Sequence, residues 1–461
     1  MSTPFKGRDL LLRALRNETT PRPAWVPFVG AHGAALIGAK ASDYLRSADL
    51  LIQGLRKADA LYRPDGLPIL FDLQMEAEVL GCDLKWSDEG PPSVASHPLE
   101  SGKTLATLPV FDTAQGRFPV AFQALDTLKK EIGDRVGLYG LICGPFTLAL
   151  HLLGNAIFMQ MFDHPDYVKA VIGFCASVGR KAAQGYLDHG ADVIAVVDPM
   201  TSQISPAHFR EYCTAPLNDL FQFIRERQRL SSLFVCGDAS RNLEAMGATA
   251  CDNMSIDENI PLERVRDVTR ACNKSFGGNL KLTSVLLLGT EDDARLDAIR
   301  CIDVGGGCGF VLAPGCDLPF HVPVQNLAAV ATMVHDSYQR EVAKRTIIAR
   351  TATAAETAPL PDYARAPAVH VDVITLDSAS CAPCQYMMDA VHRAVKRLDF
   401  PVVVAEHRIT TREGIAMMSR LKVANIPTIC IDGTPAFVSI IPDLETLVRA
   451  IQARHAGKHT A

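Results

Sequence analysis

The sequence predicts an α/β protein that consists of a (β/α)₈ barrel followed by a smaller α/β domain. Short apolar segments alternate with longer amphipathic segments over most of the chain. A stretch rich in Ala, Thr and Pro interrupts this pattern between residues 341 and 367, and the alternation resumes at His370. A chain of 461 residues is long enough for a barrel of roughly 250 residues or more and a second domain. We therefore expect a barrel over 1–340, a linker over 341–367 and a second domain over 368–461.

The barrel elements follow in order along the chain. A helix is expected over 7–17 and a first strand over 25–29. Further strands are expected at 136–143, 193–197, 233–236, 251–256, 275–279 and 309–313, with helices at 165–189, 205–229, 261–272, 290–303 and 322–340. Such alternation predicts a parallel sheet with helical crossovers, whose closed eight-stranded form is the barrel. An open doubly wound sheet is the alternative, but no Gly-x-Gly-x-x-Gly follows an early strand.

Composition and charge exclude several classes of function. Hydrophobic residues make up 48% of the chain, charged residues 21%, and the net charge is −5. The chain therefore lacks a basic field that would attract nucleic acid or anionic membranes. The first residues lack the apolar run of a signal peptide, and the apolar stretch 138–153 is too short and mixed to span a bilayer. The 13 scattered cysteines do not form the pattern of a secreted disulfide scaffold, so we expect a soluble, cytoplasmic protein.

Polar residues follow the predicted strands, where barrel enzymes carry their chemistry. The candidates are His32, Asp72, Cys143, Asp198, Cys236, Asp238, Asp252, Asp257, Asn279, Cys316 and Asp317. Each alone is a common turn residue, but together they predict a polar pocket at one mouth of the barrel. We regard Asp198 and His32 as candidate catalytic residues, and Asp257 and Asn279 as candidates for binding a cofactor.

Several segments resemble a known family. They are Arg-Pro-Ala-Trp-Val-Pro at 22–27, 71–81, Cys-Gly-Pro-Phe-Thr at 143–147, Val-Cys-Gly-Asp at 235–238, 252–257, 278–279 and Ala-Pro-Gly-Cys at 313–316. They are similar to the uroporphyrinogen decarboxylase superfamily, and within it to corrinoid-dependent methyltransferases of the methylcobamide:coenzyme M type. The resemblance implies transfer of a methyl group between a methylated corrinoid or small methyl donor and a thiol-type acceptor. It also implies a corrinoid (cobalamin), either free or carried by a partner protein.

The decarboxylases of that superfamily bind substrate carboxylates with an arginine-rich loop after the first strand. Here the corresponding loop, 29–36, contains no arginine. A tetrapyrrole with many carboxylates needs cations to pair with them. The sequence therefore argues against porphyrinogen decarboxylation.

The resemblance also implies zinc, held by a His-x-Cys pair and a distant cysteine. Zinc would convert a thiol into a reactive thiolate. Cys236 matches the first cysteine and Cys316 the second, but Phe234 stands at the histidine position. Because zinc sites use at least three protein ligands, a third would come from elsewhere, with Asp198, Asp238, His32 and His321 as candidates. Two apolar thiols or a redox pair remain the alternatives.

The C-terminal domain shows the element order βαβαββα. Strands are expected at 371–376, 402–406, 428–432 and 436–440, and helices at 385–398, 412–421 and 444–453. The dithiol Cys381-Ala-Pro-Cys384 lies between the first strand and its helix, which together predict a thioredoxin fold. Cys381 is the expected nucleophile because helix N-termini stabilise thiolates, and Cys384 is the resolving thiol. Pro427 is expected to be cis beside the pair. The segment also resembles small thioredoxin-like proteins, although Ser380 replaces the tryptophan of ordinary thioredoxin.

The sequence is compatible with three functions. The first is a methyltransferase whose tethered dithiol acts as a reductant, with a thiol–disulfide partner in the barrel or in another protein. The second is a thiol-dependent redox enzyme or reductive dealkylase that takes electrons from Cys381 and Cys384. The third is a non-catalytic interaction or corrinoid-handling module, in which Phe234 marks a lost zinc site.

Overall fold

The computed structural model describes residues 5–347, 360–363, 365–379, 381–423 and 425–458. The chain divides into two compact units. One comprises residues 1–157 and 164–349, and the other comprises residues 158–163 and 350–461.

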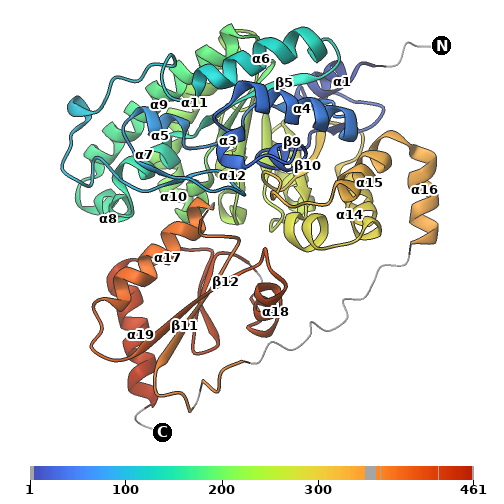
Figure 1. Cartoon of the computed structure of the whole chain (residues 1–461). Helices are drawn as coiled ribbons and strands as arrows, with labels where there is room; N and C mark the ends of the chain where they lie inside the picture. The colour runs from blue at the N-terminus through green and yellow to red at the C-terminus, as the bar shows by residue number, and fades with distance from the viewer. Residues whose placement is uncertain (1–4, 348–359, 364, 380, 424, 459–461) are drawn as a thin grey trace. The chain divides into compact units, whose positions relative to one another are not determined.

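The first unit contains eight strands in a nearly closed parallel barrel (Figure 1). They are β1 (Ala24–Trp25), β2 (Gly66–Pro68), β5 (Gly137–Cys143), β6 (Val193–Val197), β7 (Leu230–Val235), β8 (Asn253–Ile256), β9 (Ser275–Leu280) and β10 (Phe310–Pro314). Their order is β1-β10-β9-β8-β7-β6-β5-β2, and every pair is parallel. The Asp65 amide donates to the Trp25 carbonyl at 2.8 Å, which joins the chain beside β2 to β1. This arrangement matches the predicted barrel and differs from the open-sheet alternative.

Helices surround the barrel and connect its strands (Figure 1). They are α1 (Gly7–Leu15), α2 (His32–Ala35), α3 (Ala41–Tyr44), α4 (Ala48–Tyr62), α5 (Met75–Val79), α6 (Phe118–Ile132), α7 (Pro145–Leu153), α9 (Pro165–Asp188), α10 (Pro206–His208), α11 (Thr214–Glu226), α12 (Leu243–Gly247), α13 (Leu262–Ala271), α14 (Glu291–Gly305), α15 (Val324–His335) and α16 (Ser337–Thr346). Helix α8 (Ala156–Asp163) begins in this unit, and its residues 158–163 belong to the second unit. The start of α14 is stabilised by a side-chain cap. The Thr290 side chain accepts from the Asp293 amide and begins α14 as a capping box.

Several elements differ from the sequence-based expectation. Strand β2 was not predicted, because Gly66-Leu67-Pro68 is too short to show an apolar run. A small antiparallel pair, β3 (Leu84–Lys85) with β4 (Ser93–Val94), was also missed. Helix α16 extends to Thr346, so residues 341–346, which we assigned to the linker, are helical.

One apolar stretch in the described part of the chain, Pro145–Asp163, is long and hydrophobic enough to cross a membrane by length and composition. The structure buries 67% of it. It comprises α7 and α8, which are separated at Gly154 by a positive φ of 62°. Burial of this extent is what a core helix of a folded domain shows.

The barrel interior is filled by apolar side chains from many strands, as expected for this architecture. Three phenylalanines pack together there. The ring centroid of Phe234 lies 4.9 Å from that of Phe28 and 5.9 Å from that of Phe71. Cys236 and Cys316 pack against this same cluster.

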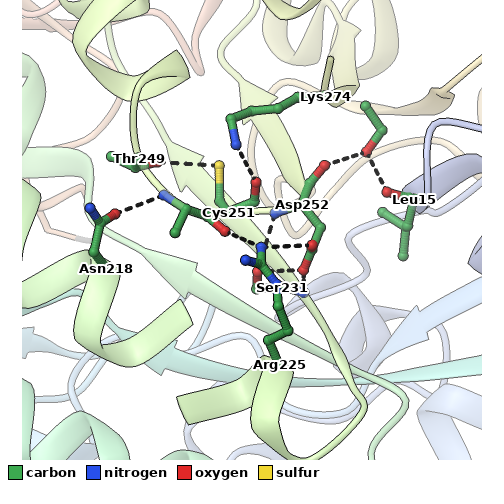
Figure 2. A network of polar contacts seen from close by, with 10 residues as sticks. Leu15, Asn218, Arg225, Ser231, Thr249, Cys251, Asp252 and Lys274 are labelled. Atoms are coloured by element: carbon green, nitrogen blue, oxygen red, sulfur yellow. Dashed lines mark hydrogen bonds and ion pairs between the residues drawn. The ribbon is translucent and has the colours of Figure 1, made fainter. Parts of the chain in front are cut away.

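Asp252 lies at the opposite end of its strand from the predicted pocket. It precedes β8, whereas our prediction placed it among the residues that follow strands. Figure 2 shows the network around it, in which its carboxylate accepts from the amide and hydroxyl of Ser231, each at 2.8 Å, and from Arg225 at 3.2 Å. Lys274 donates to the neighbouring Cys251 carbonyl at 2.6 Å. These bonds fasten the amino ends of β7 and β8 and give Asp252 a structural role.

The second unit contains a four-stranded mixed sheet in the order β12-β11-β13-β14. Its strands are β11 (Val369–Thr375), β12 (Val402–Arg408), β13 (Thr428–Ile431) and β14 (Thr434–Val438), and its helices are α17 (Ala382–Val395), α18 (Arg412–Arg420) and α19 (Leu444–Lys458). Strand β11 pairs parallel with β12 and antiparallel with β13, and β13 pairs antiparallel with β14. The observed order of elements is the predicted βαβαββα.

Two apolar clusters stabilise this sheet. One joins it to α17 and α19, with Val371, Met387 and Leu447 fully buried, and the other joins it to α18 through Ile374 and Met417. Leu360 and Tyr363 pack against the second cluster, so the end of the expected linker belongs to this unit. Residues 348–359 of that linker lie outside the described residues.

Candidate functional site

The structure brings Cys236 and Cys316 together at the carboxyl end of the barrel. Cys236 follows β7 directly, and Cys316 lies two residues beyond β10. Their sulfur atoms are 2.7 Å apart, although the residues are 80 positions apart in the chain. This separation is longer than the roughly 2.05 Å of a disulfide bond. The two side chains are half-buried thiols in direct contact.

Two carboxylates lie beside this pair. Asp317 accepts the S–H of Cys316 at 3.4 Å, and burial raises the pKa of Asp317 to about 6. Asp257 is 7% exposed and accepts from the Gly237 amide at 2.8 Å, and burial raises its pKa. The contact with Cys236, burial and both carboxylates raise the pKa of Cys316 well above its ordinary value. The Cys316 thiol is therefore protonated at neutral pH unless a base or cation acts on it.

The pKa of Cys236 is also raised. Its contact with Cys316 favours the thiolate, but burial and the charges of Asp257 and Asp317 outweigh that effect. Gly30 completes this neighbourhood, because a Cβ built on it would lie 3.2 Å from an Asp317 carboxylate oxygen and its φ is +47°. A larger residue at this position would be strained and would displace the carboxylate.

A zinc ion at this pair would need at least three protein ligands. Alternate residues of a strand face the same side, so position 234 is where a histidine could join Cys236 as a ligand. Phe234 occupies it and packs against both Phe28 and Phe71. Across the described residues, no group of three or more His, Cys, Asp or Glu side chains is placed to hold a metal.

The other candidate third ligands are engaged elsewhere. His321 is 63% exposed and pairs with Glu89 at 3.2 Å. Asp238 accepts from the Ser240 amide at 3.0 Å. Asp257 and Asp317 lie beside the two thiols, but among the described residues they do not complete a group of three ligands, which a zinc site needs. The residues present therefore do not fit the zinc centre that the sequence resemblance implied.

Asp198 is fully buried at the end of β6. It accepts from the Thr147 amide at 2.8 Å, the Thr147 hydroxyl at 2.6 Å and the Phe146 amide at 3.2 Å. Burial raises the pKa of Asp198 to about 6. A Cβ at Gly144 would overlap the Asp198 carboxyl group, so this contact requires glycine. Asp198 holds the first turn of α7 against the barrel, and its contacts are those of a positioning residue.

His32 is 1% exposed, and both of its ring nitrogens have partners. Nδ1 lies 3.0 Å from the Phe320 carbonyl, and Nε2 lies 2.7 Å from the Tyr62 hydroxyl. A carbonyl only accepts, so Nδ1 carries the proton and Nε2 accepts from Tyr62. Burial lowers the pKa of His32. A neutral His32 therefore fastens the loop that carries Cys316 to α2.

Asn279 and Asp257 are joined through the backbone. The side-chain nitrogen of Asn279 (Nδ2) donates to the backbone carbonyl of Asp257 at 3.1 Å and to that of Ile260 at 2.7 Å. The Gly278–Asn279 peptide bond is cis. Asn279 thus shapes the loop after β8 that presents Asp257.

A buried acidic group near the same end of the barrel was missed by the sequence analysis. Glu76 on α5 is 1% exposed and accepts from the Cys143 amide at 3.0 Å, and burial raises its pKa to about 7. Nearby, Arg117 pairs with the buried Asp72 and with Glu78 at 2.8 Å. The available signal was the density of acidic residues in the otherwise apolar segment 71–80.

The dithiol of the second unit lies at a helix start. Cys381 is half-buried and occupies the position before α17, and Cys384 is fully buried within the first turn. The Cys384 sulfur accepts from the Leu376 amide at 3.3 Å. The Ile426–Pro427 bond is cis.

Glu406 was also missed by the sequence analysis. It accepts from the Ser378 amide and hydroxyl, each at 3.0 Å, and so holds the loop that precedes Cys381. Its position in strand 402–406 offered no signal for this contact.

The family of the barrel is established by comparison with known proteins. The family described as Uroporphyrinogen decarboxylase (URO-D) matches residues 6–337. The chain therefore belongs to the uroporphyrinogen decarboxylase family.

Its relatives include methyltransferases. Methylcobamide:CoM methyltransferase MtbA of Methanosarcina acetivorans is 26% identical over 331 residues, which cover 70% of this chain and 96% of the relative. Methylated-thiol–coenzyme M methyltransferase of Methanosarcina mazei is 29% identical over 263 residues, which cover 56% and 69%. A solved methyltransferase from Methanosarcina mazei matches the fold with a TM-score of 0.67 and 23% identity, covering 73% of this chain and 100% of that one. The chain is therefore similar in sequence to methyltransferases of this family, and the solved methyltransferase shares the fold of its barrel.

Proposed function

We propose that the barrel transfers a methyl group from a methylated corrinoid, free or carried on a partner protein, to the sulfur of a thiol acceptor. The observation that carries this proposal is the sequence similarity of the barrel, at 26% identity, to a methylcobamide:CoM methyltransferase over 96% of that protein's length. The cluster of Cys236, Cys316, Asp257 and Asp317 at the carboxyl end of the strands supports it, because barrels of this type carry out chemistry there.

The reaction requires a base. The acceptor sulfur forms a bond to the methyl carbon, the cobalt–carbon bond breaks with its electron pair left on cobalt, and the thiol proton leaves. Asp317 suits the role of proton acceptor because it is half-buried and, with a pKa of about 6, mostly ionised at pH 7. Asp257 and Asn279 support the loop beside it. Zinc is not part of this proposal, since the residues do not fit it.

We also propose that the second unit is thioredoxin-like and that its dithiol is a reductant. The mixed sheet, the position of Cys381 directly before α17 and the burial of Cys384 support this assignment. Free amides at the helix start would stabilise a Cys381 thiolate, which is the nucleophile in thiol–disulfide exchange. Its partner is a disulfide in the barrel or in another protein. A thiol-dependent redox enzyme is the second candidate function, favoured by the close contact of Cys236 with Cys316.

The two units are proposed to fold independently, because each has apolar clusters of its own. Limited proteolysis between residues 341 and 367, followed by melting of both fragments, tests this. Two cooperative transitions are expected, and loss of the barrel on cleavage would contradict it.

Methyl transfer is tested on the full chain under anaerobic, reducing conditions with methylcobalamin and coenzyme M. Loss of methylcobalamin absorbance and appearance of the methyl thioether by mass spectrometry are the readouts. Asp317→Asn should slow the rate about a hundredfold or more, the effect of removing a positioned base. Asp219→Asn, at a carboxylate 51% exposed on α11, is the matched control and should leave the rate unchanged. The absence of thioether from the unmodified chain would refute the proposed function.

A further inference from the structure

The pair Cys236 and Cys316 has features that methyl transfer does not explain. Their sulfurs, 2.7 Å apart, need to approach by only about 0.7 Å to reach the length of a disulfide bond. Two thiolates on one zinc ion, with zinc–sulfur bonds of about 2.3 Å in tetrahedral geometry, would instead stand about 3.8 Å apart. The observed separation is therefore nearer to that of a disulfide than to that of a shared metal.

The surroundings of the pair favour covalent closure over metal binding. Position 234, where a histidine could join Cys236 as a ligand, is filled by Phe234, whose ring packs against Phe28 at a centroid distance of 4.9 Å. Both cysteines are half-buried, so part of each residue is exposed to solvent. Asp317 accepts the S–H of Cys316 at 3.4 Å and is placed to take its proton.

We propose that Cys236 and Cys316 form a redox-active pair, separate from Cys381 and Cys384, that reacts with the disulfide of a small thiol. Asp317 accepts the Cys316 proton, and the thiolate attacks one sulfur of the disulfide. A mixed disulfide forms and one small thiolate leaves. Cys236 gives its proton to the released small thiolate, attacks the Cys316 sulfur and displaces the second small thiolate, which takes the proton held by Asp317. Two cysteine thiols are oxidised, and one small disulfide is reduced to two thiols.

This assignment goes beyond methyl transfer and does not depend on it. The reverse reaction, with a dithiol as reductant, reopens the pair. The substrate class is therefore a disulfide of a small thiol in one direction and a dithiol in the other.

The test equilibrates the full chain in glutathione buffers of increasing oxidised fraction, quenches with acid and alkylates the remaining thiols. Trypsin leaves Cys236 on the peptide 230–241, and chymotryptic cleavage after Phe310 separates Cys316 from Cys301 and Cys308. We expect a linked peptide that contains Cys236 and Cys316, is lighter by two hydrogens, and disappears on addition of dithiothreitol. Cys308→Ser, at an exposed cysteine, is the matched control and should retain the link.

Cys236→Ser should abolish the link and leave a glutathione adduct on Cys316. Cys316→Ala serves as a second variant, and melting curves show whether each is folded. The proposal is overturned if folded protein shows no link in any buffer. It is equally overturned if the purified chain holds about one zinc that Cys236→Ser removes. These readouts do not use methyl transfer, so a linked peptide in a chain without methyltransferase activity would refute only the proposed function.

Discussion

Glu76→Gln should make the barrel less sensitive to alkaline pH. Glu76 is 1% exposed, and burial raises its pKa from 4.5 to about 7. Between these two values the native state keeps a proton that the unfolded chain has lost, so the free energy of unfolding falls as the pH rises. At about 1.4 kcal/mol for each pH unit, the full effect is about 3 kcal/mol, complete above the native pKa.

The substitution removes this dependence while keeping one contact. The side-chain carbonyl of the introduced glutamine can still accept from the Cys143 amide, as the Glu76 carboxylate does at 3.0 Å. About 2 to 3 kcal/mol of the difference falls between pH 5 and pH 8. The free energy of unfolding of the variant minus that of the unmodified chain should therefore be about 2 to 3 kcal/mol larger at pH 8 than at pH 5.

Urea unfolding followed by tryptophan fluorescence is the assay. Both tryptophans, Trp25 and Trp86, lie in the barrel unit, so the signal reports that unit alone. Glu226→Gln, at an exposed carboxylate on α11, is the control and should follow the unmodified chain at both pH values. Equal pH dependence in the Glu76→Gln variant and the unmodified chain would refute the reasoning, because Glu76 would then be ionised in both states.

Three further predictions concern individual side chains. Arg117→Ala leaves the carboxylate of Asp72 buried and unpaired, and should lower the free energy of unfolding by about 3–5 kcal/mol, measured by the same urea titration; an unchanged midpoint would contradict the buried pair. Phe234→His supplies the missing third ligand and should raise bound zinc to about one ion per chain, measured by metal analysis. Unchanged zinc content would contradict the idea that the absent histidine prevents zinc binding. Alkylation at mildly acidic pH should label Cys381 before the buried Cys384, and peptide mapping that finds the reverse order would show that the dithiol is structural.

The properties that the sequence alone determined are local ones. Apolar strands such as 193–197 and the amphipathic helices between them show their periodicity within a few residues, which is why the barrel and the order of the C-terminal elements could be predicted. The helix after Cys381 is similarly encoded by its own segment, since proline in the first turn and a cysteine before it need no distant partner. Strand β2 escaped prediction because three residues, one of them proline, carry no period.

Tertiary structure decided the chemistry of the site, because that depends on contacts between distant segments. Cys236 and Cys316 could be named as candidates, but only the closure of the barrel sets their sulfurs 2.7 Å apart. His32 was a plausible ligand until folding gave both of its nitrogens partners. In the sequence, Phe234 stands where related proteins are expected to have a zinc-binding histidine. Its packing with Phe28 shows that this position is apolar and lies inside the barrel. Burial and partner choice are properties of the whole fold, and a linear pattern does not contain them.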